Sequence, residues 1–262
     1  MAIHQGGEPL LEFRLAYLRA IARSWDDPAY QEELLAQKDI QPILHRDFGL
    51  NTWWPNLDIV LNRSADPAEQ TEWKPELTAG WIGMDDGFSV VLPQAPKAKA
   101  TEALAAYYQM FPDFMGSVTT FDDGATSVLR GALPTSLGIP SGGTDSLLAF
   151  GGVVLRAVTL AWQSPEFLKQ LTRSGETDTD AAPVLSQWLG YNNPFNFQVK
   201  FVTNPAFTWD AEAGEWNRTN DDGSPIKNAI VLNYPVAPAV EHMRPIALTS
   251  YNNTGSAYPF TC

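Results

Sequence analysis

The sequence contains a single cysteine, Cys262, and only three histidines in 262 residues. One cysteine excludes an internal disulfide framework and any metal site built from several thiolates. The histidines, His4, His45 and His242, lie far apart in the sequence, and none has the spacing from another that metal ligands show. We therefore expect no metal and no cofactor.

Basic residues are also scarce. The chain has 17 Lys and Arg against 30 Asp and Glu, a formal net charge of −13 at pH 7. Binding of DNA or RNA needs a concentrated basic surface, so nucleic acid is excluded as a partner. There is no run of about 20 apolar residues to cross a membrane, and the first residues do not resemble a secretory signal. We expect a protein that is made and kept in the cytoplasm, at least at first.

The common catalytic motifs are missing as well. The sequence has no glycine-rich dinucleotide fingerprint, no phosphate-binding loop, no His-Glu-x-x-His zinc motif and no Gly-x-Ser-x-Gly nucleophile elbow. We therefore predict that the chain has no catalytic residues and is not an enzyme. An enzyme built on an unfamiliar motif is the weakest of the alternatives.

What the sequence does contain is a duplication. Residues 18–30 match residues 155–167 without a gap, at an offset of 155 − 18 = 137. Later matches keep their order at slightly larger offsets, as loop insertions would produce. The pair Gly49 and Gly190, for example, is offset by 141. We predict a first repeat at 10–110, a Gly/Pro/Ser/Thr-rich linker at 111–144, a second repeat at 145–249 and a tail at 250–262.

Each repeat begins with helical patterns. Apolar residues at helical spacing predict a core-facing stripe in the first helix of each repeat. Asp27-Pro28 and Ser164-Pro165 each combine an N-cap residue with proline at the first helical position, so a second helix should begin there. Glycines 49 and 190 should end the helical part. The residues expected in the two stripes are Leu11, Leu15, Leu18 and Trp25, and Leu148, Leu155, Val158 and Trp162.

Strand patterns follow the helices. Residues 57–61 and 197–202 are rich in apolar and β-branched residues, as strands are. Trp81 and Trp216 each precede an Asp-Asp-Gly turn and a further apolar run, which predicts a hairpin in each repeat. Helices followed by a small, mostly antiparallel sheet make each repeat an α+β unit.

Reactive side chains gather near the end of the sequence. Cys262 carries the only thiol, Thr261 precedes it, and Ser256 and Thr254 supply nearby hydroxyls. A thiol or hydroxyl can attack the preceding amide carbonyl and lose water to close a thiazoline or oxazoline ring, provided that an enzyme activates the amide oxygen. Residues 252–262 lack periodicity and charged side chains, which predicts a flexible tail. The tail has the properties of a substrate; a free thiol on a frayed end is the alternative.

The pattern Trp-x-x-Pro-x-Tyr/Phe occurs in both repeats, as Trp25, Pro28 and Tyr30 and as Trp162, Pro165 and Phe167. With its flanks, it resembles the helical opening of the nitrile hydratase α subunit and of the leader domains of ribosomal natural-product precursors. The cysteine claw that binds metal in the hydratase is absent here, which excludes hydratase activity. The resemblance implies two tandem nitrile hydratase α-like leader domains followed by a flexible C-terminal tail.

Both repeats and the ending Tyr258-Pro259-Phe260-Thr261-Cys262 together resemble a family of duplicated precursors of thiazole/oxazole-modified (TOMM) peptides, a class that includes bacteriocins. The resemblance implies that the folded part is recognised by maturation enzymes and that the tail is modified. The implied partners are a YcaO-type cyclodehydratase with its dehydrogenase or, because a single cysteine gives few heterocycle sites, a multinuclear iron-dependent oxidase with its partner protein. The six residues of the repeated pattern are the expected recognition residues. The alternative function is a non-catalytic binding or scaffold protein.

Overall fold

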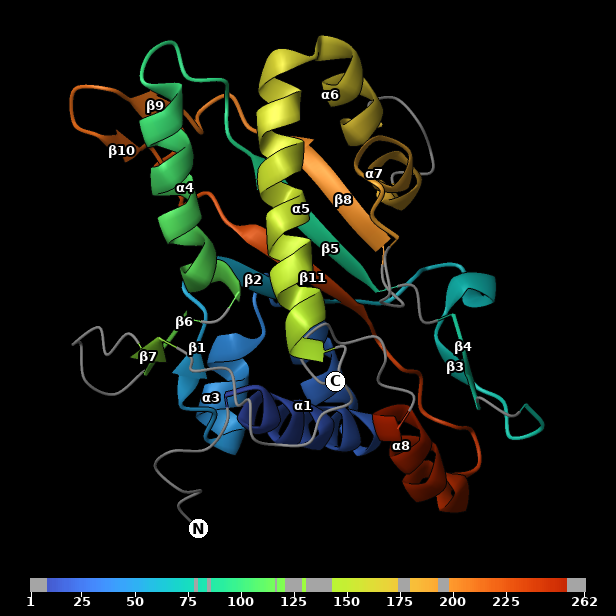
Figure 1. The fold of residues 1–262 in the computed structure, drawn as a ribbon. Helices are drawn as coiled ribbons and strands as arrows, with labels where there is room; N and C mark the ends of the chain where they lie inside the picture. The colour runs from blue at the N-terminus through green and yellow to red at the C-terminus, as the bar shows by residue number, and fades with distance from the viewer. Residues whose placement is uncertain are drawn as a thin grey trace.

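The computed structural model describes residues 9–77, 80–83, 86–115, 117–120, 129–130, 143–173, 180–192 and 198–253. Within these residues the chain is a mixed α+β protein (Figure 1). The helices are α1 (Pro9–Asp26), α2 (Pro28–Leu35), α3 (Gln41–Phe48), α4 (Ala100–Met115), α5 (Gly143–Gln163), α6 (Pro165–Thr172), α7 (Ala182–Leu189) and α8 (Arg244–Asn253), with short 3₁₀ turns at Pro67–Glu69 and Glu241–Met243.

The central feature is a sheet with the strand order β2-β11-β5-β8, made of four strands. Its strands are β2 (Leu57–Asn62), β5 (Gly87–Leu92), β8 (Gln198–Thr203) and β11 (Asn228–Asn233). The outer pairs, β2 with β11 and β5 with β8, are parallel, whereas the central pair, β11 with β5, is antiparallel. Strands of the first and second repeats therefore alternate across the sheet.

The remaining strands are short. The first repeat contains β1 (Thr52–Trp53), β3 (Glu72–Trp73) and β4 (Trp81–Ile82), and the second contains β9 (Trp209–Asp210) and β10 (Glu215–Trp216). Between the repeats, β6 (Ser117–Thr120) pairs with β1 and with β7 (Leu129–Arg130). Part of the predicted linker therefore packs against the first repeat.

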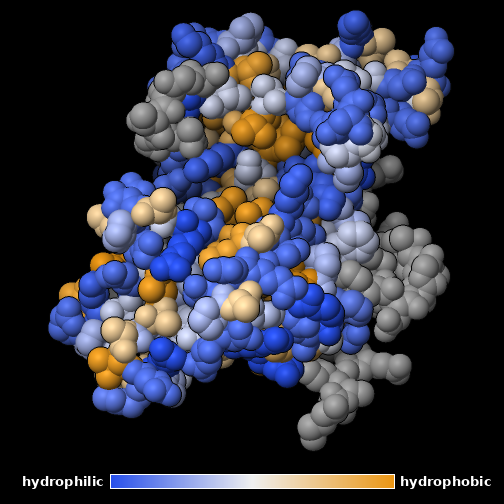
Figure 2. All heavy atoms as spheres, turned by 180° about the vertical axis from the view of Figure 1, so that it is seen from behind, coloured by the Kyte–Doolittle hydropathy of each residue, from blue (hydrophilic) through white to orange (hydrophobic). Residues whose placement is uncertain are grey.

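One face of the sheet forms the floor of the core. Ile59, Ile230, Phe88 and Val199 lie in register across all four strands and are buried. Apolar residues at alternate positions of a strand share a face, which explains this row. Helices lie over this face in Figure 1, whereas Figure 2, from behind, shows apolar patches among polar atoms. On that second face Val202 is 43% exposed. The core thus lies between the helices and one face of the sheet.

The outer edges of β2 and β8 are hydrogen-bonded in the same way to the segments that precede α3 and α7. In the first repeat, Ile40 N donates to Ile59 O at 2.8 Å, and Ile59 N donates to Asp39 Oδ1 at 3.3 Å. In the second repeat, the N–H groups of Ala181 and Val199 make the equivalent bonds at 2.6 and 3.0 Å, the latter to Asp180 Oδ1. Exposed edge strands invite pairing with other chains, so these bonds protect both edges.

Several local predictions are confirmed. Asp27 Oδ1 accepts from Tyr30 N at 3.1 Å and caps α2, and Ser164 Oγ accepts from Phe167 N at 3.2 Å and caps α6. Gly49 and Gly190 follow α3 and α7 with φ of 69° and 67°, the left-handed conformation that glycine adopts without strain. The duplicated sequence therefore folds into duplicated helix corners.

Other predictions were wrong. In the predicted stripes Trp25 and Val158 are buried and Leu18 is half-buried, as expected, but Leu15 is 44% exposed. The core-facing side of α1 runs instead through Phe13, Tyr17, Ala20 and Ile21. The strand after each Asp-Asp-Gly does not pair with the strand before it: β4 pairs with β3, and β10 with β9. The small, mostly antiparallel sheet expected in each repeat is replaced by the shared mixed sheet. Strand pairing between the repeats buries the apolar faces of both, so it prevails over the hairpins.

Candidate recognition surface

The two tryptophans of the repeated pattern join the repeats. Trp25, at the end of α1, donates its Nε1–H to Pro235 O at 2.8 Å and stacks on Trp81, with ring centroids 6.2 Å apart. Trp162, at the end of α5, donates to Pro93 O at 3.0 Å and stacks on Trp216 at 6.0 Å. The two indoles make equivalent contacts, each with a carbonyl group of the other repeat.

Helix α8 of the second repeat is held by the first repeat. Trp81 Nε1 donates to Ala247 O at 2.9 Å, and the Trp81 ring meets the ring of Tyr251 edge-on with centroids 5.3 Å apart. Tyr251 is completely buried, and its hydroxyl oxygen lies 3.0 Å from that of Tyr17 in α1. At the start of α8, Arg244 Nη1 lies 2.5 Å from Asp26 Oδ1. The helix that leads into residues 254–262 is therefore fixed at both ends.

The tail was predicted to begin at residue 250, but α8 continues through Asn253, so residues 250–253 belong to the folded part. The four residues expected to be modified, Thr254, Ser256, Thr261 and Cys262, lie outside the described residues. Their position relative to the fold therefore stays a prediction.

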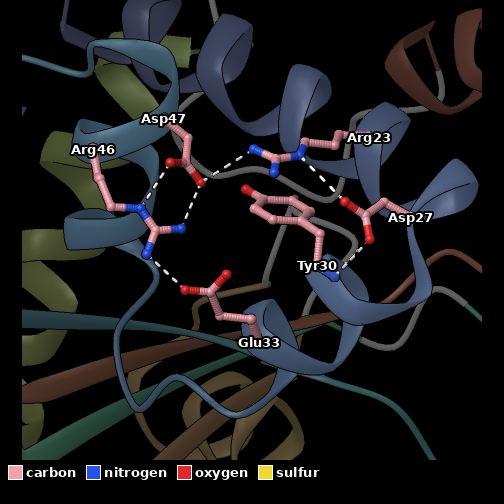
Figure 3. Close-up of polar contacts among 6 residues, drawn as sticks. All are labelled: Arg23, Asp27, Tyr30, Glu33, Arg46 and Asp47. Atoms are coloured by element: carbon pink, nitrogen blue, oxygen red, sulfur yellow. Dashed lines mark hydrogen bonds and ion pairs between the residues drawn. The ribbon is translucent and has the colours of Figure 1, made fainter.

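Next to α8, the corner formed by α1, α2 and α3 carries a cluster of charged side chains (Figure 3). Arg46 in α3 binds Asp47 through Nε at 2.7 Å and Nη2 at 2.8 Å, and its Nη1 donates to Glu33 Oε1 at 2.6 Å. Arg23 Nη1 lies 3.6 Å from Asp47 Oδ2, and Arg23 Nε lies 3.8 Å from Asp27 Oδ2. We call Arg23, Asp27, Glu33, Arg46 and Asp47 the charged corner.

An aromatic ring lies beneath the charged corner. The Arg23 guanidinium carbon lies 4.1 Å from the centroid of the Tyr30 ring, within the range of a cation–π contact. Tyr30 is only 2% exposed, and burial raises the pKa of its hydroxyl to about 12. Hydrogen bonding by Arg46 lowers the pKa of Asp47 and that of Glu33. Both carboxylates therefore stay ionised at neutral pH, and the corner presents a fixed pattern of charges to solvent.

The charged corner gives a pH dependence with a defined sign. Lowered carboxyl pKa values in the folded protein mean that the ion pairs stabilise the fold above the unfolded pKa values, near 4, and that this contribution is lost as the pH falls further. As the pH is lowered from about 5 to about 3, the unfolding free energy of Arg46→Met should therefore fall less than that of the wild type. Denaturant unfolding across that range measures the slope.

Arg46→Lys serves as a control for this prediction, because lysine keeps the positive charge but cannot form the two parallel bonds to Asp47. It should retain part of the slope. An unchanged slope in Arg46→Met would show that the corner contributes nothing to the acid sensitivity of the fold.

The same corner of the second repeat has different chemistry. At the offsets of 137 and 141 residues, Phe167 stands in place of Tyr30, Gln170 in place of Glu33, and Trp188 in place of Asp47. Phe167 meets Trp188 edge-on at 5.3 Å, and Trp188 Nε1 donates to Gln170 Oε1 at 2.8 Å. Trp188 remains 38% exposed. The duplicated fold thus presents a charged corner in one repeat and an aromatic corner in the other.

The predicted recognition residues lie at these corners but contribute mainly to packing. Trp25, Tyr30 and Phe167 are at most 7% exposed, and Trp162 is half-buried. Pro28 and Pro165 occupy the first position of α2 and α6. Sequence reasoning missed the exposed charges around Tyr30 and the anchor Tyr251. The match of residues 103–107 to 247–251 was a signal that could have identified Tyr251.

The described part of the chain holds no cluster of histidine, cysteine and acidic side chains suited to a metal ion. His45 instead directs Nδ1 at Leu50 O, 2.6 Å away. None of the described helices combines the length and apolarity needed to cross a membrane.

A protein-family model matches most of the chain. The family model described as "Ribosomal natural product, two-chain TOMM family" matches residues 8–115 and again residues 145–259. The double match supports the duplication found in the sequence. Searches of curated proteins and of solved structures found no match. The likeness to the nitrile hydratase α subunit therefore stays a prediction.

Proposed function

Because the chain belongs to the two-chain TOMM family of ribosomal natural products, we propose that it is a precursor whose folded repeats recruit maturation enzymes to residues 254–262. The observation that supports this proposal most directly is the anchoring of α8. Tyr251, completely buried, lies two residues before the end of that helix. Whatever follows Asn253 is therefore tethered to the fold at a defined point.

Tethering explains how recognition can be separated from reaction. A binding partner that docks on the folded part meets the tethered segment at a high effective concentration, without contacting the residues to be modified. Residues 254–262 can span about 30 Å when extended. An active site within that distance of α8 can therefore reach Cys262.

We place the docking surface on the first repeat, at the charged corner. Asp26, which binds Arg244 of α8, stands in the sequence between Arg23 and Asp27, two residues of that corner. Electrostatic complementarity favours fast and specific association. Trp25, Pro28 and Tyr30 then act in recognition by shaping this corner, and Trp162, Pro165 and Phe167 by shaping its aromatic counterpart.

The modification that we favour is cyclodehydration at Cys262. The thiol sulfur attacks the carbonyl carbon of Thr261, the former carbonyl oxygen leaves as water, and a thiazoline forms. A dehydrogenase that accepts two electrons and two protons would convert the thiazoline into a thiazole. Thr254, Ser256 and Thr261 offer hydroxyls for the corresponding oxazolines. Oxidation at Cys262 by an iron-dependent oxidase is the competing modification.

Coexpression with the genes neighbouring this one, followed by intact and fragment mass spectrometry, tests the proposal. Cyclodehydration predicts a loss of one water localised to residues 254–262, and an azole predicts the further loss of two hydrogens. Cys262→Ala should abolish the loss at that position, whereas Cys262→Ser can still form an oxazoline. Thermal unfolding of Cys262→Ala should match the wild type.

Each other outcome has a defined meaning. A different mass change at Cys262 would favour oxidation over cyclodehydration. An unmodified tail in the presence of all neighbouring gene products would contradict the precursor proposal and favour a scaffold protein. A large loss of stability in Cys262→Ala would assign Cys262 to the fold.

A further inference from the structure

The strand order of the central sheet leaves each repeat incomplete. The first repeat contributes β2 and β5, but β11 of the second repeat lies between them. The second repeat contributes β8 and β11, and β5 of the first repeat lies between those. In this sheet, no two strands of the same repeat are neighbours. A repeat on its own could pair its two strands only by adopting a different strand order.

Hydrogen bonds of four indoles cross between the repeats in the same reciprocal way. Trp25 and Trp81 of the first repeat donate to Pro235 O and Ala247 O of the second. Trp162 and Trp216 of the second repeat donate to Pro93 O and Ala103 O of the first. A buried N–H that loses its acceptor is costly, so each repeat needs the other to satisfy its indoles.

The helices that end the repeats are exchanged too. α8 of the second repeat packs on α1 of the first, and α4 of the first packs on α5 and β10 of the second. Tyr107 of α4 is 4% exposed and meets Trp216 edge-on, just as Tyr251 of α8 meets Trp81. The interface therefore has the self-complementary form of a twofold dimer, in which the same surface is used twice.

We propose that the two repeats are obligate folding partners, and that their interface does not require the covalent connection between them. The partner that each repeat fits is a second unit of the same fold. Within the described residues, the connecting strands β6 and β7 pair with β1 and with each other, and take no part in the central sheet. The chain is thus equivalent to a dimer of like units joined end to end.

A protease site inserted between Arg130 and Gly143 of the full chain tests this proposal. After cleavage, the two pieces should still migrate as one particle with about the mass of the 28.8 kDa chain. Their melting temperature should rise with protein concentration, because association becomes bimolecular, whereas that of the uncut protein should not. Separation of the pieces at micromolar concentration, each retaining its own cooperative unfolding transition, would overturn the proposal.

Hydrogen exchange in the intact chain gives a second test that does not depend on the inserted site. Trp81→Phe keeps a ring but removes the donor to Ala247, so exchange in α8 should accelerate about five- to tenfold while α4 changes little. Trp216→Phe should have the reverse effect, on α4. Acceleration confined to the repeat that carries the substitution would show that the repeats fold independently.

Discussion

Replacing Tyr251 with alanine is expected to lower the free energy of unfolding by about 3 to 5 kcal/mol, the range measured for truncation of buried aromatic residues. Tyr251 is completely buried, and its removal takes away the edge-on contact with Trp81 and the polar contact with Tyr17. Denaturant unfolding measures the loss, and hydrogen exchange should show that α8 is the segment released.

Tyr107→Ala is the matched control. Tyr107 occupies the equivalent place in α4, where it contacts Trp216 and Phe207. Its truncation should cost a similar free energy but release α4 rather than α8. At a temperature where both variants are folded, only Tyr251→Ala should slow modification of residues 254–262, because it alone loosens the helix that leads into them. Equal slowing in both variants would contradict the role of α8 as an anchor.

Local features of this fold were predictable because their causes are local. A cap depends on one side chain and the backbone two or three residues ahead, so Asp27-Pro28 and Ser164-Pro165 were sufficient to place α2 and α6. Gly49 and Gly190 mark positions where the chain adopts positive φ. Repetition of each signal at a nearly constant offset strengthened both predictions.

The pairing of the strands was not predictable by the same reasoning. The alternating pattern of β5 or β11 requires one buried face, but it does not determine which strand lies beside it. The local sequence pattern of a strand is the same whether the strand pairs within its repeat or with the other repeat. The hairpin prediction failed for this reason, since Gly87 follows an Asp-Asp pair yet begins a strand that pairs with β11 and β8.

The side of α1 that faces the core was also ambiguous. Two adjacent stripes of this helix are apolar, one through Leu11, Leu15 and Leu18 and the other through Phe13 and Tyr17. Periodicity identifies an amphipathic helix but does not choose between neighbouring stripes when both are apolar. The choice depends on Trp54 and Tyr251, which pack on Phe13 and Tyr17 from distant parts of the chain.

For a related reason, the candidate recognition surface could be predicted only in part from the sequence. A tyrosine or phenylalanine three residues after a cap can lie in the core or on the surface, and the pattern alone does not distinguish the two. Arg46 and Asp47 meet Arg23 and Glu33 only because α3 folds back beside α1 and α2. Their charges were visible in the sequence, but their cluster required the fold.

Trp25→Ala is expected to separate stability from recognition. Trp25 is 7% exposed, stacks on Trp81 and donates to Pro235 O. Its truncation leaves a cavity and a carbonyl without its partner, so the free energy of unfolding should fall by about 3 to 5 kcal/mol. Trp162→Ala, at the half-buried equivalent position, should cost less. Chemical denaturation of both variants measures the difference.

Arg46→Ala provides the opposite case. Its ion pairs lie at the surface, where such pairs contribute little to stability, so at neutral pH the variant should lose only the small part of its unfolding free energy that acid also removes. If the charged corner is the docking surface, Arg46→Ala should nevertheless slow modification of residues 254–262. Trp25→Ala, assayed where it is folded, should be slowed less, because Trp25 only shapes this corner from beneath. The two variants change neighbouring parts of one corner, so they can be compared directly. If folded Trp25→Ala were modified slowly and Arg46→Ala at the normal rate, the docking surface would involve the Trp25 indole and not the charged corner.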